Sequence, residues 1–524
     1  MNGESLLYVN NRLANRETYL EWDKILMGPI RDSVGAEQGG INSGDFYKLY
    51  NNEQISSAQD TSLGVEIHGI TVCSIGQADD VGLVSNDIHK LECLLFLSEL
   101  YCRKFNVKLC AEKTKLLVIS PKNNREQIEL VKLANTLSLD GSHINFVDSA
   151  EHVGVIRSTS GNILNIFNRI TSHKRALGAT MAAGLAQSHR ANPAAGLKIQ
   201  QMYGTPVLMS GLASLVLSNS EIDIINHHVK AKLESIQKLF PRTPAPVVFF
   251  LGGSLPGKAL LHLRQLNLFG MICRLSGNIL NRIAIEKLTA ARTTSNSWFL
   301  QIRNLCLQYR LPHPMDLIKS PHPKQVFKKL VKSKVIDFWE HHYRMEALSL
   351  DSLCYFQPSF MSLTTPHPIW SSAKSNPYEV SKARIQALML SGRYRTEMLM
   401  SHWTHRDGNC LALSCSGMNR PETVEHILVL CPSFADIRSK LFRFWKSATS
   451  KMYPELSEIV RCALTNPVKY RCQFILDCSV MPEVIQLVQT HGTSRRDHLL
   501  YLTRSFCFAI HRERLKIRGE WKSV

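Results

Sequence analysis

The sequence predicts an α+β fold in its first third and a mainly α-helical fold beyond it. In the first third, short runs rich in β-branched residues alternate with turn signals, as in Gly69–Ser85 and Leu137–Ile156, and this pattern is typical of short strands. From Asn162 onward, apolar residues recur at helical spacing over long stretches such as Glu221–Leu239. The chain has 524 residues, 44% of them hydrophobic, so we expect two or more domains with sizeable cores.

Charge is distributed unevenly along the chain. The net charge is +19 and the pI is about 9.4, which suits a polyanionic partner. Residues 1–120 hold 11 Lys and Arg against 16 Asp and Glu, whereas the remainder holds 51 against 27. We therefore expect contacts with RNA or DNA in the later two thirds. The alternative is a generally basic surface without a ligand.

The 14 cysteines are scattered through the chain, which argues against a dense disulfide framework and suits a reducing compartment. The predicted location is therefore intracellular, in the nucleus or the cytoplasm. The first residues contain no apolar run typical of a signal peptide. No stretch reaches the roughly 18 consecutive apolar residues of a membrane span, so no membrane contact is expected.

Gly69–Ser85 predicts a β-hairpin that carries two adjacent aspartates at its tip. Its strands are predicted over Val72–Gly76 and Val81–Val84, and Asp79 and Asp80 lie between them. Paired carboxylates at such a turn can hold Mg²⁺, which prefers oxygen ligands. The alternative is a polar turn, because Asp readily hydrogen-bonds its own backbone there.

Two helices and a strand are expected around this hairpin. Ser43 is suited to cap a helix that runs to about Gln54 and lies under the hairpin. Asp87 is suited to cap a second helix, whose apolar residues recur at helical spacing. Lys108–Ser120 is then predicted to return as a strand.

Four segments in this order resemble the second half of the reverse transcriptase palm of non-LTR (LINE-like) retrotransposons. They are Gln38-Gly39-Gly40 followed by Ser43 and Tyr47, then Gln77-Ala78-Asp79-Asp80, Lys113-Thr114-Lys115, and His152-Val153-Gly154. The resemblance implies RNA-directed DNA synthesis as the ancestral reaction, with RNA, DNA and dNTPs as its partners.

The resemblance also implies roles for individual residues. Asp79 and Asp80 correspond to catalytic Mg²⁺ ligands, which in such enzymes align the primer end and the nucleotide phosphates. Gln38 and Gly39 correspond to positions near the incoming nucleotide and the template, and Gly154 to the primer grip. Lys113 corresponds to a lysine that neutralises phosphate charge or donates a proton to the leaving group, the alternative being a solvated lysine at the end of a strand.

Two departures from the family pattern stand out. Gln77 occupies the place of an aromatic residue that is not a metal ligand. The family also carries a catalytic aspartate on an earlier palm strand, in a segment of the type F-x-D-x-x-x-A-F-D. No such segment precedes Gln38, and Asp23 lies in a helical-looking stretch. We therefore expect a truncated palm without polymerase activity as it stands, or one completed by an upstream half-palm on another chain.

A second constellation lies near the carboxyl terminus. Cys410, Cys415, His426 and Cys431 follow one another with spacers of four, ten and four residues. Thiolates and imidazole suit tetrahedral Zn²⁺, and four protein ligands predict a structural site. The surrounding sequence resembles the CCHC knuckle at the carboxyl end of non-LTR retrotransposon proteins. The alternative is a set of buried cysteines and a histidine in a helical core.

The predicted organisation has five parts. They are a truncated palm (1–160), a helical thumb-like region (161–280), a helical connector (281–390), a CCHC zinc-knuckle-like module (391–440) and a helical tail (441–524). The expected function is that of a retrotransposon-derived reverse transcriptase protein. The alternative is a non-catalytic RNA- or DNA-binding remnant with a structural zinc site.

Three basic features are candidates for contacts with nucleic acid. Lys324–Lys334 and His511–Lys522 are rich in basic residues that can attract phosphates. Tyr394, flanked by Arg393 and Arg395, is an aromatic able to stack on a base. The alternative for each is a solvated helix face or a helix end stabilised by its arginines.

Overall fold

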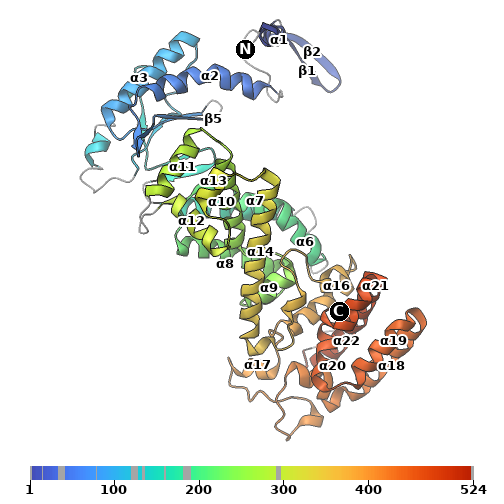
Figure 1. Ribbon diagram of the computed structural model, residues 1–524. Helices are drawn as coiled ribbons and strands as arrows, with labels where there is room; N and C mark the ends of the chain where they lie inside the picture. Colours follow the sequence, from blue (N-terminus) through green and yellow to red (C-terminus); the bar gives the residue numbers. More distant parts are fainter. Residues whose placement is uncertain are drawn as a thin grey trace. The chain divides into compact units, whose positions relative to one another are not determined.

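The computed structural model describes residues 3–14, 16–32, 42–77, 80–119, 128–132, 136–158, 161–180, 191–290 and 297–520. Its contacts divide the chain into two compact units, Met1–Gly161 and Asn162–Val524, shown from blue to red in Figure 1. The first unit mixes helices with short strands, and the described part of the second is helical. The α+β expectation is confirmed in this broad sense, and the finer division into five parts stays a prediction.

The strands of the first unit form only two-stranded sheets in the part of the chain that is described. Five pairs are antiparallel (β1–β2, β3–β4, β5–β6, β8–β9 and β11–β12), and β7 pairs with β10 in parallel. The elements are α1 (Gly3–Leu13), β1 (Arg16–Trp22), β2 (Ile25–Asp32), α2 (Ser43–Asp60), β3 (Val65–Ile67), β4 (Ile70–Val72), β5 (Ser74–Gln77), β6 (Asp80–Leu83), α3 (Ile88–Phe105), β7 (Lys115–Leu116), β8 (Ser138–Leu139), β9 (Ser142–His143), β10 (Asn145–Phe146), β11 (Ser149–His152) and β12 (Val155–Ser158).

The predicted aspartate hairpin is present, and α2 packs against it. In the β5–β6 pair, Gln77 lies opposite Asp80. The Ser74 hydroxyl donates to the backbone oxygen of Ile55 in α2 at 3.1 Å. A Cβ at Gly76 would come within 2.4 Å of the Ile55 side chain, so the absence of a side chain at Gly76 permits this close approach. The expectation that this helix lies under the hairpin is confirmed.

α3 links two small hydrophobic clusters in the first unit. Leu94 packs with Ala58 and Cys73 on one side. Another group of α3 side chains packs against the cluster of Leu137, Leu139 and Ile144. The carboxylate of Asp87 accepts hydrogen bonds from the first turn of α3, as predicted. Short hairpins are marginally stable alone, so α2 and α3 supply much of the support for this unit.

Three local predictions for the first unit are corrected. Asp23, in a stretch that looked helical, lies in the turn between β1 and β2 with φ +48°. Ser43 is the first helical residue of α2, and the N-cap is Asn42, whose side chain makes no capping bond. The strand predicted over Lys108–Ser120 is reduced to β7. The reason is that the backbone N–H groups of Lys113 and Thr114 both bond to the carbonyl of Cys110, at 3.1 and 3.0 Å, and form a turn.

The second unit is built from packed helices. They are α5 (Ile163–Thr180), α6 (Pro193–Ile199), α7 (Thr205–Leu208), α8 (Asn219–Gln237), α9 (Ala245–Gly252), α10 (Gly257–Cys273), α11 (Ile279–Ala290), α12 (Trp298–Gln308), α13 (Pro314–Lys319), α14 (Lys324–Leu348), α15 (Pro368–Ser371), α16 (Pro377–Leu390), α17 (Glu397–Ser401), α18 (Ala435–Met452), α19 (Pro454–Thr465), α20 (Val468–Leu476), α21 (Pro482–His491) and α22 (Thr493–Ile517). Short helical turns connect them: η3 (Gln200–Gly204), η4 (Leu212–Ser214), η5 (Asp351–Leu353), η6 (Pro358–Phe360), η7 (Leu413–Cys415), η8 (His426–Leu430), η9 (Pro432–Phe434) and η10 (Cys478–Val480).

α9 lies at the centre of the first half of this unit. All of its residues from Pro246 to Gly252 are buried, as expected for a helix that is apolar on every side. Phe249 stacks on Tyr343 of α14 with ring centroids 5.2 Å apart. The side chain of Gln237, at the end of α8, donates to the carbonyl of Val248 at 2.9 Å. The core therefore combines aromatic packing with satisfied buried amides.

No single helix in the described part of the chain is long and apolar enough to cross a membrane. Helices α9 and α10, bent by 62° at the break between them, pass that test of length and composition only as a pair. Val248, Phe250 and Leu261 of this pair have no exposed surface. Packing inside the second unit thus accounts for their apolar character.

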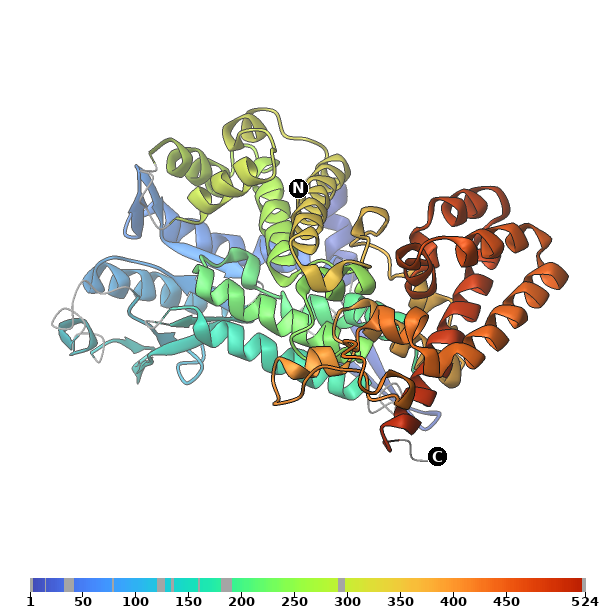
Figure 2. The same cartoon turned by 90° about the horizontal axis from the view of Figure 1, so that it is seen from below.

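The carboxyl-terminal helices pack around α22, in the region coloured orange to red in Figures 1 and 2. Phe506 of α22 packs against Trp445 of α18, with ring centroids 5.4 Å apart. Arg504 of α22 donates to Glu379 of α16 at 2.7 Å, and both side chains are largely buried. The long helix α22 therefore carries apolar and ionic contacts to several neighbours.

Gly253 provides a test of this core. It follows α9 in the left-handed conformation (φ +53°), and a Cβ there would lie 2.0 Å from the carbonyl carbon of Thr365. We expect Gly253→Ala to destabilise the protein by about 1–2 kcal/mol for the left-handed backbone and about 1–3 kcal/mol more for displaced neighbours. Denaturant unfolding followed by circular dichroism measures the change.

Gly277 is the matched control for this substitution. It is also left-handed (φ +75°), but no atom lies within 4 Å of the position that a Cβ would take there. Gly277→Ala should therefore cost only the conformational part, about 1–2 kcal/mol. Equal destabilisation by the two substitutions would contradict the close approach of the chain to Gly253.

Candidate functional site

The second unit brings the four predicted zinc ligands together. Cys410 follows a short β-bridge, Cys415 ends η7, His426 begins η8, and Cys431 precedes η9. All four residues are buried, and their ligand atoms lie within 4.8 Å of one another. The structure thus gathers into one cluster residues that lie up to 21 positions apart in the chain.

The separations between the ligand atoms fit a tetrahedral zinc ion. The Sγ atom of Cys431 lies 3.9 Å from that of Cys410 and 3.8 Å from that of Cys415. The Sγ atom of Cys415 lies 3.5 Å from Nε2 of His426. Zn–S bonds of about 2.3 Å and Zn–N bonds of about 2.0–2.1 Å at tetrahedral angles require S–S separations of about 3.8 Å and S–N separations of about 3.5 Å.

The same separations exclude disulfides in this cluster. A disulfide needs an S–S distance of about 2.05 Å, and all three cysteines are free thiols. Burial raises the pKa of Cys410 to about 12, raises that of Cys431 and lowers that of His426. Without an ion, burial thus favours neutral thiols. Because zinc binds thiolates, coordination here would release protons.

A half-buried arginine adjoins the cluster. Nη1 of Arg438, in the first turn of α18, is buried and has no hydrogen-bond partner among the described residues. Burial lowers the pKa of Arg438, and the nearby Cys431 acts in the opposite direction. Three thiolates, a neutral imidazole and Zn²⁺ carry a net charge of −1, which a neighbouring guanidinium would balance. The residues present therefore fit a closed structural zinc site.

Backbone hydrogen bonds fix the conformation of the loops that carry the four candidate ligands. The N–H of Cys410 donates to the carbonyl of Arg420 at 2.9 Å, which brings the two ends of the first loop together. The N–H of Cys415 donates to Ala412 at 2.8 Å, and that of Cys431 to His426 at 2.7 Å. The ligands are thus placed on tight turns rather than on long regular elements.

A buried ion pair ties this module to α22. Glu422 and Arg514 are 3% and 4% exposed, and Arg514 donates to both Glu422 carboxylate oxygens, at 2.7 and 3.1 Å. The Oε2 atom of Glu422 also accepts from the backbone N–H of Glu397 at 2.7 Å. Removing one partner of such a buried pair typically costs about 3–5 kcal/mol. The module is therefore an integral part of the second unit.

Glu397 extends this ionic network. It is 2% exposed and accepts two hydrogen bonds from Arg406, at 3.0 and 3.1 Å. Arg518, just after α22, forms a second ion pair with Glu397. The sequence analysis missed the pairing of Glu422 with Arg514, because partners 92 positions apart leave no local signal.

The prediction that Tyr394 stacks on a base is wrong. Tyr394 is 5% exposed, its hydroxyl lies 2.7 Å from Nδ1 of His511, and the Arg514 guanidinium lies over its ring at 5.3 Å. Arg395 lies over the Phe240 ring at 4.6 Å. These contacts hold Tyr394 inside the protein, so its face is not accessible to a base.

The aspartate hairpin presents Asp80 to solvent at the start of β6. Gln38, Gly39 and Asp79 lie outside the described residues. In the described part of the chain, the only group of three or more potential metal ligands is the Cys/His cluster. A Mg²⁺ site at the hairpin therefore stays a prediction.

The other two residues with a predicted role in the palm, Lys113 and Gly154, lie in turns. Lys113 is exposed in the turn before β7, and its side chain has no hydrogen bond or ion pair among the described residues. Gly154 lies at the tip of the β11–β12 hairpin with φ +72°, next to Val153 with φ +52°. A glycine suits this left-handed position. Their predicted roles in binding phosphate and primer are not tested by these positions.

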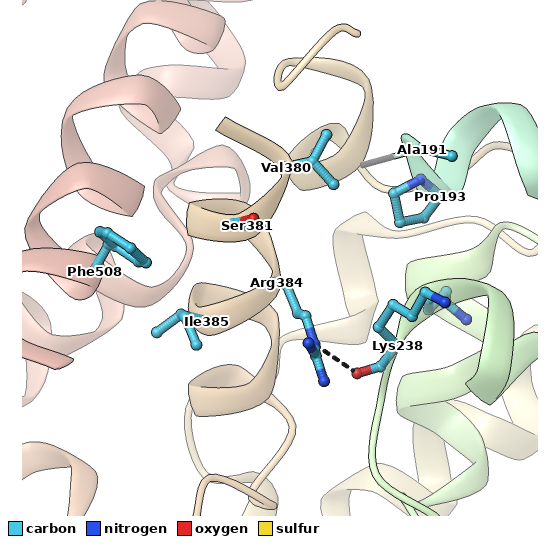
Figure 3. Close-up of a pocket in the computed structure, with 9 residues that line it drawn as sticks. Ala191, Pro193, Lys238, Val380, Ser381, Arg384, Ile385 and Phe508 are labelled. Atoms are coloured by element: carbon cyan, nitrogen blue, oxygen red, sulfur yellow. Dashed lines mark hydrogen bonds between the residues drawn. The ribbon is translucent and has the colours of Figure 1, made fainter. Parts of the chain in front are cut away.

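Figure 3 shows a pocket of about 110 Å³ between α6, α8, α16 and α22. Nε of Arg384 donates to the carbonyl of Lys238 at 3.0 Å, and burial lowers the pKa of Arg384. The lining side chains include no carboxylate, thiol or imidazole. The pocket therefore offers no catalytic acid, base or nucleophile of these kinds, and Arg384 joins α16 to the end of α8.

Comparison with models of known protein families finds none that matches this chain, and comparison with curated proteins finds no match.

The geometry predicts that the purified protein contains about one equivalent of Zn²⁺ bound by Cys410, Cys415, His426 and Cys431. Elemental analysis after exhaustive desalting measures it. The combined substitution Cys415→Ser and Cys431→Ser should abolish retention, because two of four ligands are removed. The whole chain is the appropriate sample, since Glu422 is held by α22.

Cys93→Ser combined with Cys354→Ser is the control for this measurement. Both cysteines are exposed and lie outside the cluster. This variant should keep the wild-type zinc content. Retention of zinc by the Cys415/Cys431 variant would refute the assignment.

Proposed function

We propose that this chain is a retrotransposon-derived reverse transcriptase protein that binds RNA or DNA and does not polymerise on its own. In this proposal the Met1–Gly161 unit is a partial palm, and the Asn162–Val524 unit is a helical nucleic-acid-binding region that contains the structural zinc site. The proposed location is the nucleus or the cytoplasm, consistent with the free thiols of the chain.

The observation that carries the palm assignment is the packing of α2 against the aspartate hairpin. The resemblance rests on four sequence segments, and the first of them, Q-G-G, directly precedes α2 in the chain. α2 in turn packs on β5 of the aspartate hairpin. This arrangement supports the palm interpretation, because the segment expected near the nucleotide leads into the helix that supports the hairpin expected to be catalytic.

Charge supports nucleic acid as the ligand of the second unit. Residues 162–524 hold 47 Lys and Arg against 22 Asp and Glu, a net charge of +25. A surplus of this size favours a polyanion such as RNA or DNA. The zinc cluster would serve this unit by fixing its fold, since four protein ligands leave no open position for a substrate.

The second candidate is a polymerase completed by another chain. In the described part of the first unit, neither outer edge of the β5–β6 pair is paired with a further strand. A strand from a partner could extend the sheet there and supply the additional oxygen ligands that two Mg²⁺ ions require. Only this candidate makes dNTPs a substrate.

We expect the purified chain to give no primer extension with an RNA template, dNTPs and Mg²⁺ or Mn²⁺. The physical reason is that two carboxylates on one hairpin do not complete the coordination of two metal ions. A gel assay of a labelled primer tests this. Extension by the wild type that disappears in Asp79→Ala would overturn the expectation and show that the hairpin is catalytic.

We also expect the protein to bind RNA and single-stranded DNA without strong sequence preference. Because phosphate contacts release counterions, affinity should fall on the order of a thousandfold between 50 and 200 mM salt if about six phosphates are contacted. Filter binding over a salt series measures the slope. Affinity that does not change with salt would contradict the electrostatic basis of the proposal.

A further inference from the structure

The first turns of α14, the long yellow helix of Figure 1, carry an energetically unfavourable concentration of charge. Lys324, Lys328, Lys329 and Lys332 are all exposed and lie within the first nine residues, and the first turn contains no acidic residue. The amino-terminal end of a helix is the positive end of its dipole, so lysines are disfavoured there. Like charges four residues apart add further repulsion.

These lysines also lack the acidic neighbours that other helical lysines in this unit have. Lys230 pairs with Glu234, Lys382 with Glu379, and Lys516 with Glu513, each within 2.8 Å. None of the four lysines at the start of α14 forms an ion pair within the described residues. The positive charge of these four lysines is therefore concentrated on the surface, and no ion pair with a described residue of the protein compensates it.

The packing of α14 fixes which face these lysines occupy. Phe327, Val331 and Val335 point into the core, with exposed fractions of 2%, 0% and 0%. Along the exposed flank of this buried stripe, Lys324, Lys328 and Lys332 follow one another at intervals of four residues. With a rise of 1.5 Å per residue, successive lysines are offset by about 6 Å along the helix. This offset is comparable to the spacing of successive phosphates along a nucleic-acid strand.

The preceding segment carries one further exposed lysine together with the exposed Asp316. Lys319, at the end of α13, is exposed, and only four residues separate it from the start of α14. His322 in this connection stacks on Phe327, with ring centroids 6.4 Å apart and planes inclined by 20°. The buried Phe327 thus anchors the connection between α13 and α14.

We propose that the lysine face of α14, defined as Lys324, Lys328, Lys329 and Lys332, binds the phosphate backbone of single-stranded RNA or DNA. This inference rests on the proposed function and specifies where the second unit contacts its ligand. Lysine presents a compact charge without the fork geometry that reads base edges, so contacts here position the strand and carry no sequence preference. A bound strand would relieve the repulsion between the lysines.

An anionic membrane surface is the less favoured ligand. Amphipathic helices that lie on membranes insert an accessible apolar face into the interface. The apolar face of α14 is instead occupied by the core, as Val331 and Val335 show. In the first nine residues of α14, Val326 is exposed (52%), which is far less apolar surface than the face that such helices insert into a membrane.

The test compares two variants of the full chain with equal loss of charge. One combines Lys324→Gln, Lys328→Gln and Lys332→Gln. The other combines Lys440→Gln, Lys446→Gln and Lys451→Gln on α18, where all three lysines are exposed. Gln and Lys have similar helix propensities, and the first variant also removes repulsion. Both variants should therefore fold, which circular dichroism and thermal unfolding check.

Fluorescence anisotropy with a short labelled RNA of mixed sequence over a salt series gives the readout. The α14 variant should lower the salt slope by about two, near 0.7 for each phosphate of a single strand that is no longer bound, and the α18 variant should not change it. Equal reductions in both variants would overturn the inference and leave only bulk charge. An unchanged slope in the α14 variant would overturn it as well.

Two further outcomes distinguish a failure of this inference from a failure of the proposed function on which it rests. If the wild type does not bind RNA even at low salt, the proposed function fails and the inference fails with it. Binding to phosphatidylserine vesicles that disappears in the α14 variant, while its RNA salt slope stays unchanged, would overturn the inference in favour of a membrane ligand. RNA binding with a reduced slope only in the α14 variant supports it.

Discussion

The burial of three cysteines and a histidine at one point is the constraint on which the carboxyl-terminal half of the second unit depends. The chain between α17 and α18 contains only short helical turns, so it has little regular structure of its own. Four buried polar side chains would be costly there if they were not engaged. A tetrahedral metal ion would satisfy Cys410, Cys415, His426 and Cys431 together. Glu422 lies between Cys415 and His426 in the chain, and its ion pair with Arg514 connects this segment to α22.

The two units use their polar groups for different purposes. In the first unit, α2 and α3 support short hairpins, and the Asp80 end of the aspartate hairpin is left exposed. This arrangement is consistent with the proposed partial palm, in which the exposed hairpin would need further carboxylates to bind two metal ions. In the second unit, the buried ion pairs of Arg504 with Glu379 and of Arg514 with Glu422 stabilise the packing of the helices.

The distribution of the basic residues shows why net charge alone is a poor guide to a ligand. Arg504 and Arg514 are buried and pair with Glu379 and Glu422, so they contribute to the total charge but not to an accessible surface. The guanidinium group suits such buried, bidentate pairing. The lysines at the start of α14 are exposed and form no ion pair within the described residues, so they are among the charges that a polyanion can reach.

The sequence by itself determined the features that depend on local order. Short runs rich in β-branched residues predicted the aspartate hairpin, and helical spacing predicted α3 with its Asp87 cap and the helical second unit, because these are local properties of the chain. The four zinc ligands were also predicted, since close pairs of ligands are visible as spacing. The turn at Cys110–Thr114, which shortened the predicted strand to β7, was missed because competing backbone bonds leave no clear periodicity.

Only the tertiary structure decided which side chains are accessible and which are paired. Tyr394 has the sequence context of a base-stacking residue, but His511 and Arg514, more than 100 positions away, bury it. The pairing of Glu422 with Arg514 and the exposure of the α14 lysines depend on how α22 and the core helices pack. Contacts between residues distant in the chain arise from the packing of whole helices and strands. Composition and residue spacing alone therefore do not predict them.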